Sequence, residues 1–461
     1  MKKKVVIVIA LALSVILALT LLAGCAKTTD SAFSQGMIAV QKDGLWGFAD
    51  ENGDIAIDCK YDFVSPFYGE YAAVKMGSRS FLIDVKGNDT GIELASASVE
   101  ANEDRTLIAA REKYTGLAGV LSTESGEWVI RAAYDGIEFL EGGLVLVFIG
   151  SGSGNYGLFD ATGAEICPAE YTACAIGENA VIMEKTVQGE RVADVFATDG
   201  TVISEDVKIA DAGTTKGGLA YYEYTTPATD TAAEKVNQVV PGMNWDKDTS
   251  VSELIEGTTS VYVTEDTATS AEGGVTTTYS VFKADGTALF NGLTKAPVYR
   301  SGVLQIDRTA ADATAPSYTY VDMKSGSALE NVPNGFTVSG ETPAISFMRL
   351  DDDSLYYAIG KEVFAMDNAT AVFTGEEDAE TIDVLAAGVF VEMSKTGVMK
   401  IYNNGVMVFE IGVGQMIDDA TLDGAYFAVT NAEGYVALYK NDGTRLFGFD
   451  KEITAVDFAE E

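Results

Sequence analysis

Histidine is absent from this chain of 461 residues, so side-chain chemistry would have to come from other groups, chiefly carboxylates. Histidine is the commonest general base, a frequent metal ligand and the partner of most serine and cysteine nucleophiles. Its absence argues against the usual zinc enzymes and catalytic triads. The 69 Asp and Glu residues leave open a glycoside hydrolase, which needs two carboxylates about 5 to 10 Å apart. No pair stands out by spacing, so we expect no catalytic residue and keep the hydrolase as the enzymatic alternative.

Three cysteines lie beyond residue 25. Cys59 alternates with Ile55 and Ile57 on the apolar face of an expected strand, which favours a buried structural thiol. Cys167 and Cys174 fall on strands expected to be adjacent, where a disulfide is geometrically allowed and two free thiols are the alternative. Without a histidine, no thiol has the usual base partner of a catalytic cysteine.

Acidic runs occur at 351–353 (D-D-D) and 376–378 (E-E-D). A calcium-binding loop needs oxygen ligands at alternate positions around a turn glycine, and neither run has that layout. We interpret both runs as solvated loops. The sequence therefore predicts no metal site and no cofactor.

The remaining candidates for recognition are aromatic residues. Trp46 and Trp128 sit in apolar strands and are expected to pack between structural units. Trp245 instead lies in a polar stretch, where it either anchors a ligand or packs under its own loop. The run that leads into this stretch extends the candidate binding patch through Tyr221, Tyr222 and Tyr224.

The elements that would position these residues repeat along the chain. In the first full unit, residues 45–50 form an expected strand and Gly53 supplies the positive φ of a tight Asn-Gly hairpin turn. Residues 55–60 then alternate between apolar and polar, and two short apolar runs follow at 63–67 and 71–76. The pattern predicts three or four short antiparallel strands in each unit.

This unit resembles the WG-repeat family of bacterial, often cell-surface, proteins. The resemblance rests on L-W-G-F-A-D at 45–50, the Asn-Gly turn, K-Y-D at 60–62 and Y-A-A-V at 71–74. Later units at 119–135 and 156–171 keep parts of the motif without its tryptophan. The resemblance implies a scaffold built of β repeats and says little about a ligand.

Turn glycines recur mostly at intervals of about 34 to 40 residues, a spacing typical of propellers, solenoids and repeat arrays. The series is Gly53, Gly87, Gly126, Gly163, Gly200, Gly286, Gly326, Gly405 and Gly443. Between Gly326 and Gly405 a further unit fits around a turn at Gly360-Lys361. The period breaks at 225–257, a segment rich in Thr, Ala and Asp that we interpret as an insertion on one loop. Residues 261–263 and 276–282 are expected to form a long hairpin beside it.

The two ends of the repeat array complement each other. The last unit ends near Phe458 without a fourth strand, whereas 37–42 matches a fourth strand without a first three. If these two partial units join in one sheet, the chain has no exposed sheet edge at either end of the array. We therefore predict an all-β, propeller-like ring over residues 36–461. The sequence yields about ten units, more than the roughly 4 to 8 blades of a typical ring, so two smaller propellers or an open β-solenoid are alternatives.

Residues 1–24 form a targeting segment, with three lysines followed by an apolar run. Leu22-Ala23-Gly24-Cys25 looks like a bacterial lipoprotein processing site, which implies that Cys25 is lipidated and becomes the mature N-terminus; a plain membrane anchor is the alternative. Residues 25–35 are small and polar, as a tether would be. Both interpretations place the remaining chain outside the cytoplasm and bound to a membrane.

The charge of the chain separates classes of partner. The formal net charge is −38, and it becomes −41 once residues 1–24, with three lysines and no acids, are removed. A field of this sign repels phosphate backbones, so nucleic acid is not expected as a partner. We therefore predict a non-enzymatic, lipid-anchored extracytoplasmic protein that binds or scaffolds a protein, peptide or envelope glycan through propeller loops.

Overall fold

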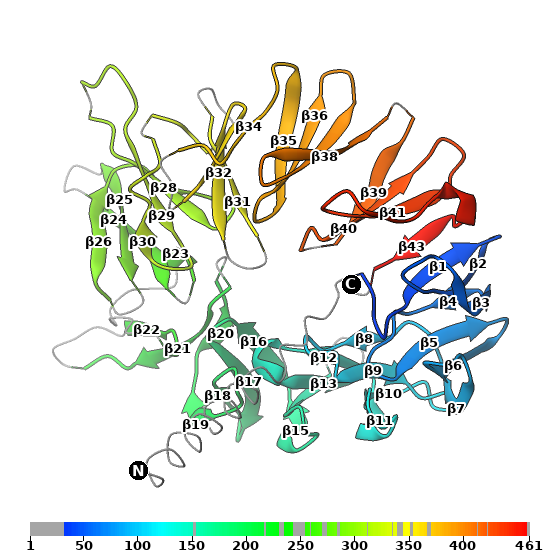
Figure 1. The fold of residues 1–461 in the computed structure, drawn as a ribbon. Coiled ribbons are helices and arrows are strands. Elements are labelled where there is room, and N and C mark those ends of the chain that lie inside the picture. The colour runs from blue at the N-terminus through cyan, green and yellow to red at the C-terminus, as the bar shows by residue number, and fades with distance from the viewer. Residues whose placement is uncertain are drawn as a thin grey trace, which may run out of the picture.

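The computed structural model describes residues 32–458, with gaps at 151–153, 216–217, 230–234, 243–253, 259, 270–273, 284–285, 311, 334, 339–343, 351–353, 367–369, 413 and 422. The predicted lipidation site Cys25, the acidic run 351–353 and Trp245 lie outside the described residues. The described chain forms eleven antiparallel sheets, ten of four strands and one of three, arranged in a ring (Figure 1). No helix in this part of the chain is long and apolar enough to cross a membrane.

Each sheet is a blade, and in all but the closing blade its strands follow one another in the chain. The blades of the N-terminal half are β4 (Phe63–Val64), β5 (Tyr71–Met76), β6 (Arg79–Asp84) and β7 (Asp89–Leu94); β8 (Glu100–Ala101), β9 (Leu107–Arg111), β10 (Ala118–Ser122) and β11 (Trp128–Tyr134); β12 (Gly136–Phe139), β13 (Val145–Ile149), β14 (Asn155–Phe159) and β15 (Glu165–Tyr171); β16 (Ala173–Gly177), β17 (Ala180–Val187), β18 (Glu190–Phe196) and β19 (Val202–Lys208); and β20 (Asp211–Thr214), β21 (Ala220–Thr226) and β22 (Lys235–Val239).

The C-terminal half continues the same order. Its blades are β23 (Leu254–Gly257), β24 (Val261–Thr269), β25 (Val275–Lys283) and β26 (Ala288–Leu293); β27 (Val298–Arg300), β28 (Val303–Asp307), β29 (Tyr318–Asp322) and β30 (Ser327–Ala328); β31 (Ser346–Arg349), β32 (Leu355–Ile359), β33 (Glu362–Ala365) and β34 (Phe373–Thr374); β35 (Ala379–Ala386), β36 (Val389–Ser394), β37 (Met399–Asn403) and β38 (Val406–Ile411); and β39 (Met416–Ala420), β40 (Tyr426–Thr430), β41 (Val436–Lys440) and β42 (Arg445–Phe447). In the described residues, two short 3₁₀ helices, η1 (Glu141–Gly143) and η3 (Phe449–Lys451), lie in loops.

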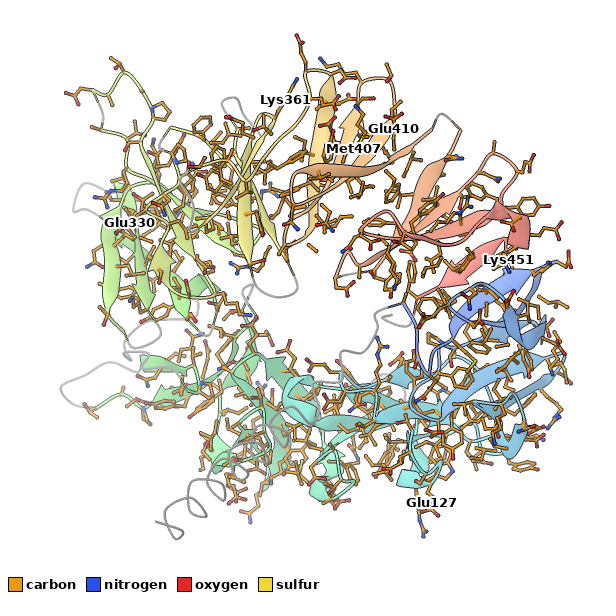
Figure 2. The ribbon with its side chains drawn as sticks, viewed as in Figure 1. Glu127, Glu330, Lys361, Met407, Glu410 and Lys451 are labelled. Atoms are coloured by element: carbon orange, nitrogen blue, oxygen red, sulfur yellow. The ribbon has the colours of Figure 1, made fainter. Side chains whose placement is uncertain are left out.

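The eleventh blade is built from both ends of the chain. β43 (Ala455–Asp457) pairs antiparallel with β1 (Ile38–Lys42), with Val40 opposite Val456, and β2 (Leu45–Ala49) and β3 (Ile55–Tyr61) complete the sheet (Figure 1). Lys451, labelled in Figure 2, adds an ion pair with Asp54 at 2.6 Å across this seam. The predicted closed wheel is confirmed, and the two-propeller and open-solenoid alternatives are wrong.

One detail of the predicted closure is wrong. Residues 37–42 match a fourth strand by sequence, but β1 is the second strand of its blade, between β43 and β2. The reason is that the sequence repeat begins two strands into a blade: it starts at the third strand of one blade and ends at the second strand of the next. The unit at 45–76 comprises β2 and β3 of the closing blade followed by β4 and β5 of the next. Three strands of the closing blade therefore come from the N-terminal end and one from the C-terminal end.

The predicted turn glycines are confirmed. All nine lie between the third and fourth strands of a blade, with positive φ between 66° at Gly326 and 85° at Gly443. Glycine reaches this region without the steric cost that a Cβ imposes. The turn predicted at Gly360-Lys361 forms as well, but it joins the second and third strands, β32 and β33.

The segment 225–257, interpreted from sequence as an insertion on one loop, contributes strands to the ring. It contains the end of β21, then β22, which pairs with β21, and β23, which pairs with β24. β20 to β22 form the blade that the count of about ten units lacks. The predicted long hairpin is β24 and β25, paired from Val261 and Lys283 to Thr269 and Val275.

The hydrophobic cores of the ring lie between neighbouring blades. The buried residues that the structure describes form eleven clusters, one at each junction between consecutive blades. At the first junction Phe48 of the closing blade meets Phe67 of the next, with ring centroids 4.6 Å apart. Trp46 and Trp128 pack into such junctions, as predicted. Central strands are covered on both faces, which explains continuous apolar runs such as 72–74.

Candidate binding groove

In each blade of the N-terminal half, one loop joins the first strand to the second. In four consecutive blades these loops, here called the AB loops, are residues 65–70, 102–106, 140–144 and 178–179. Each surface pocket described below is lined by residues from two adjacent blades. Neighbouring AB loops therefore face one another across these pockets. The ring thus places equivalent loops in a row.

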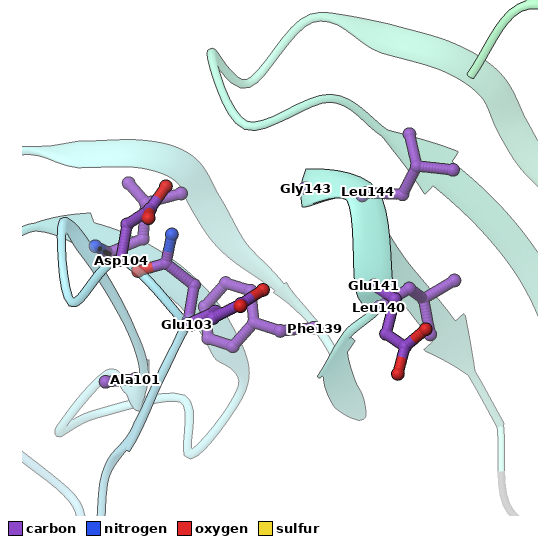
Figure 3. A pocket seen from close by; sticks show the side chains of 11 residues that line it. Ala101, Glu103, Asp104, Phe139, Leu140, Glu141, Gly143 and Leu144 are labelled. Carbon is purple, nitrogen blue, oxygen red and sulfur yellow. Dashed lines mark hydrogen bonds between the residues drawn. The ribbon is translucent and has the colours of Figure 1, made fainter. Parts of the chain in front are cut away.

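The largest of these pockets, of about 440 Å³, lies between the second and third AB loops. Figure 3 shows Glu103 and Asp104 on one side of it and Glu141 on the other. Phe139 and Leu144 supply apolar surface to the lining. The pocket therefore combines carboxylates from two blades with an apolar wall.

Two further pockets continue this one along the ring. A pocket of about 410 Å³ shares Glu103 with it and adds Tyr68 and Arg105, and a pocket of about 300 Å³ shares Glu141 and adds Glu178. We call the combined surface the AB groove. Its charged and aromatic residues are Tyr68, Glu100, Glu103, Asp104, Arg105, Glu138, Phe139, Glu141 and Glu178.

The AB groove is strongly acidic. It carries six carboxylates and one guanidinium, and all six acidic side chains are exposed. None of the ion pairs between described residues involves any of the six. Six like charges that gather with a single counter-charge create a potential that attracts cations.

Backbone contacts hold the AB loops in place. The Asn102 side chain accepts a hydrogen bond from the Leu107 N–H at 2.8 Å, which ties the ends of one loop together. In the next loop Gly142 has φ of 79°, and a Cβ there would lie 2.3 Å from the carbonyl oxygen of Thr198 in the neighbouring blade. Only glycine fits this approach, so the loop that carries Glu141 is seated against the blade beside it.

The aromatic residues predicted for binding have different environments. Tyr221 and Tyr222 on β21 pack against the cores of the two junctions that flank their blade, and burial raises the pKa of each phenol. Tyr224 is 40% exposed at the far end of the strand. Because the first two rings fill cores, only Tyr224 of this set presents its ring to solvent. None of the three lines the AB groove.

The cysteines within the described chain are free thiols. Cys167 on β15 and Cys174 on β16 contact the same junction core but belong to different blades, and of the two alternatives that the sequence left open they are the two free thiols. Burial raises the pKa of Cys167 to about 12 and that of Cys174 to about 11, which keeps both thiols protonated at neutral pH. Cys59 is half-buried, and burial raises its pKa as well.

The AB groove was missed from the sequence, although a signal for it exists. Glu103, Glu141 and Glu178 each stand two to four residues before the apolar second strand of their blade. The same strand marks each repeat in the sequence, so acids aligned to it belong to equivalent loops. That alignment has meaning only once a ring places the loops side by side.

Fold and groove together define a β-propeller with repeated units, an architecture that fits a binding or scaffold role. Within that class, residues 31–46 and 46–79 match the family described as WG containing repeat. The match covers the unit on which the resemblance was based, and it confirms that resemblance. No curated protein matches the chain.

Solved structures resemble the chain only in part. A structure titled as the eukaryotic initiation factor has 9% identity and a TM-score of 0.31, covering 82% of this chain and 96% of its own. An uncharacterized protein from Listeria monocytogenes EGD-e has 10% identity and a TM-score of 0.25, covering 59% and 92%. The hydrazine synthase of Kuenenia stuttgartiensis has 10% identity and a TM-score of 0.21, covering 83% and 95%.

Proposed function

We propose that this protein is a non-enzymatic binding scaffold, lipid-anchored through Cys25 at the extracytoplasmic face of a bacterial membrane. Its AB groove binds a positively charged segment of a protein or peptide. The observation that carries the proposal is the row of six exposed, unpaired carboxylates along three consecutive blades. An uncharged glycan would make no use of this charge, whereas lysine and arginine side chains would.

The chemistry of the groove supports a peptide with basic and apolar residues. Carboxylates accept charge-assisted hydrogen bonds from lysine and arginine, and the half-buried Phe139 offers apolar and aromatic contact between them. Repetition along the ring gives several weak sites in a row. An extended chain with spaced positive charges can occupy them together, which raises its overall affinity.

Binding is tested with two labelled peptides of equal length, one with lysines and tyrosines and one with glutamates in place of the lysines. Fluorescence anisotropy on the full chain in detergent should detect the basic peptide alone, with an affinity that falls as salt rises. Exchange of Glu103 and Glu141 for lysine should weaken binding by about tenfold or more, because two attractions become repulsions.

A matched control separates the groove from the net charge of the molecule. Glu127, labelled at the outside of the ring in Figure 2, and Glu433 are exposed and lie outside the groove. The double exchange Glu127→Lys with Glu433→Lys changes the net charge by the same amount as the double exchange at Glu103 and Glu141. It should leave the affinity for the basic peptide nearly unchanged. Equal losses in the two double variants would mean diffuse attraction only and would contradict the proposed groove.

The anchor is tested separately from the groove. Cells that express the chain and are fed radiolabelled palmitate should incorporate label into the wild-type protein and none into Cys25→Ser. In detergent phase partition, the variant should move from the detergent-rich phase to the aqueous phase, because one cysteine carries all acyl chains. Label retained by Cys25→Ser would overturn lipid anchoring at this residue and leave the groove proposal standing.

A further inference from the structure

A second cluster of carboxylates lies across the ring from the AB groove, where the chain passes from β34 to β35 (Figure 1). Glu376 and Asp378 stand in this connection, and Glu392 projects from β36. One carboxylate oxygen from each residue lies within 4.8 Å of the other two. Three oxygen ligands thus converge from two segments of the chain.

Glu392 is the unusual member of the cluster because it is 0% exposed. Its Oε2 accepts a hydrogen bond from the backbone N–H of Glu376 at 2.8 Å, while its Oε1 has no hydrogen-bond partner. A buried carboxylate that lacks partners is costly, and native structures normally satisfy such a group with a donor or a cation. The oxygen without a partner, Oε1, therefore belongs to the same Glu392 carboxylate that lies close to the carboxylates of Glu376 and Asp378.

Contacts of the backbone hold the connection against the Glu392 carboxylate. The ammonium group of Lys361, labelled in Figure 2, donates to the backbone carbonyls of Glu376, at 2.8 Å, and Glu377. A Cβ at Gly375 would lie 3.1 Å from Oε2 of Glu392, so the absence of a side chain lets the loop approach the buried carboxylate. The acidic residues are therefore fixed by contacts of the backbone.

One ammonium group already partly balances the cluster. Lys400 on β37 pairs with Glu376 at 2.6 Å, and the Tyr402 hydroxyl donates to the same carboxylate at 3.1 Å. Lys400, and to a smaller extent Tyr402, hold the pKa of Glu376 below its usual range. Lys400 also stands directly opposite Glu392 in the β36–β37 pair. Three carboxylates against this one side chain leave excess negative charge at the centre of the cluster.

We propose that Glu376, Asp378 and Glu392 bind a Ca²⁺ ion, with Lys400 moving aside from Glu376 when the ion enters. An all-oxygen ligand set suits a hard cation, and Ca²⁺ accepts the irregular, mixed geometry that carboxylates from a loop and a strand provide. Three carboxylates supply between three and six oxygens, and water completes the roughly 6 to 8 that the ion takes.

Bound Ca²⁺ would link two structural elements. Glu376 and Asp378 lie in the connection between two blades, and Glu392 lies in the second strand of the later blade. The ion would fasten this connection to the sheet and raise the stability of the ring, since it binds only the folded chain. The AB groove shares none of these residues, so its function and this site are independent.

Tb³⁺ luminescence tests the site directly, because Tb³⁺ replaces Ca²⁺ at oxygen sites and Tyr402 is placed to sensitise its emission. The full chain in detergent at physiological salt should show saturable emission that Ca²⁺ displaces. Glu392→Gln should weaken Ca²⁺ affinity by at least about tenfold, as loss of a direct ligand exceeds typical effects of supporting residues. It should also abolish the rise in Tm that Ca²⁺ produces.

Matched variants make the result decisive. Glu184→Gln removes another buried glutamate, one already paired with Arg191 at 2.6 Å, and should retain wild-type Ca²⁺ binding. Lys400→Met should bind Ca²⁺ at least as tightly as wild type, because the competing ammonium is gone. If Glu392→Gln does not fold, Asp378→Asn at the exposed ligand replaces it. Equal binding by wild type and the ligand variants would overturn the site, and equal competition by Mg²⁺ would overturn the choice of Ca²⁺.

Discussion

A chain that ends at Glu452 is expected to lose much of its stability and to self-associate, because β43 is then missing from the closing blade. The deletion removes the side chains of Ile453 and Phe458, which are 0% and 3% exposed. Burial of two such side chains is worth about 3 to 6 kcal/mol. That amount is comparable with the ~5 to 15 kcal/mol that stabilises a typical domain.

The same deletion changes how the ring ends. β1 keeps its pairing with β2 but loses the backbone partners that β43 supplies, so its other side becomes an exposed edge, which invites pairing with another molecule. Urea denaturation should show a lower midpoint, and size-exclusion chromatography should show larger species. A chain that ends at Phe458 keeps β43 and should behave as wild type. A monomeric Glu452 truncation of wild-type stability would show that the seam contributes nothing.

The closed ring could be predicted from the sequence because local chemistry specifies its parts. In nine blades a glycine between the third and fourth strands supplies a positive φ that other residues adopt only with strain, so these turns and the strands beside them are visible in the sequence. The unmatched strands at the two ends then require a partner, and β1 and β43 satisfy each other. The blade boundaries could not be read in this way, since a repeat in sequence has no intrinsic first strand.

The missed blade had no such local signal. β22 buries Asn237 and Gln238, at 8% and 2% exposed, where strands of other blades bury apolar residues. Polar residues at core positions hide the hydrophobic pattern on which strand prediction depends. No glycine of the turn series falls in this blade either, so the count gives about ten units instead of eleven blades, and the segment looks like an insertion.

The two candidate sites depend on distances that the sequence does not contain. The acidic run at 376–378 alone lacks the layout of a calcium loop, and the sequence-based prediction of a solvated loop follows correctly from that run. Glu392 lies close to this run only because β35 and β36 form a hairpin, and β36 returns next to the connection between β34 and β35. Likewise, Glu103 and Glu141 become neighbours only when adjacent blades pack.

Gly47 explains why glycine follows tryptophan in the repeat. Trp46 pairs with Tyr61 and Phe48 with Ile57, so residues 58–60 of β3 bulge opposite Gly47 alone. A Cβ there would lie 2.5 Å from the carbonyl oxygen of Ile57, inside any allowed contact. Equivalent bulges in two later blades face Gly119 and Gly157. A Cβ at these positions would lie 2.6 Å and 2.8 Å from the backbone nitrogens of Ala132 and Ala169, respectively.

Exchange of Gly47 for alanine should therefore destabilise the protein by about 3 kcal/mol, because a strand backbone cannot yield as a side chain can. Gly412→Ala is the matched control: its Cβ would have no neighbour within 4 Å and its φ is not positive. That exchange should be neutral or stabilise by up to about 1 kcal/mol through the unfolded chain. Urea denaturation of both variants measures the difference. Equal stability of the two would mean that the bulge opens without cost, and the glycine of the repeat would then need another explanation.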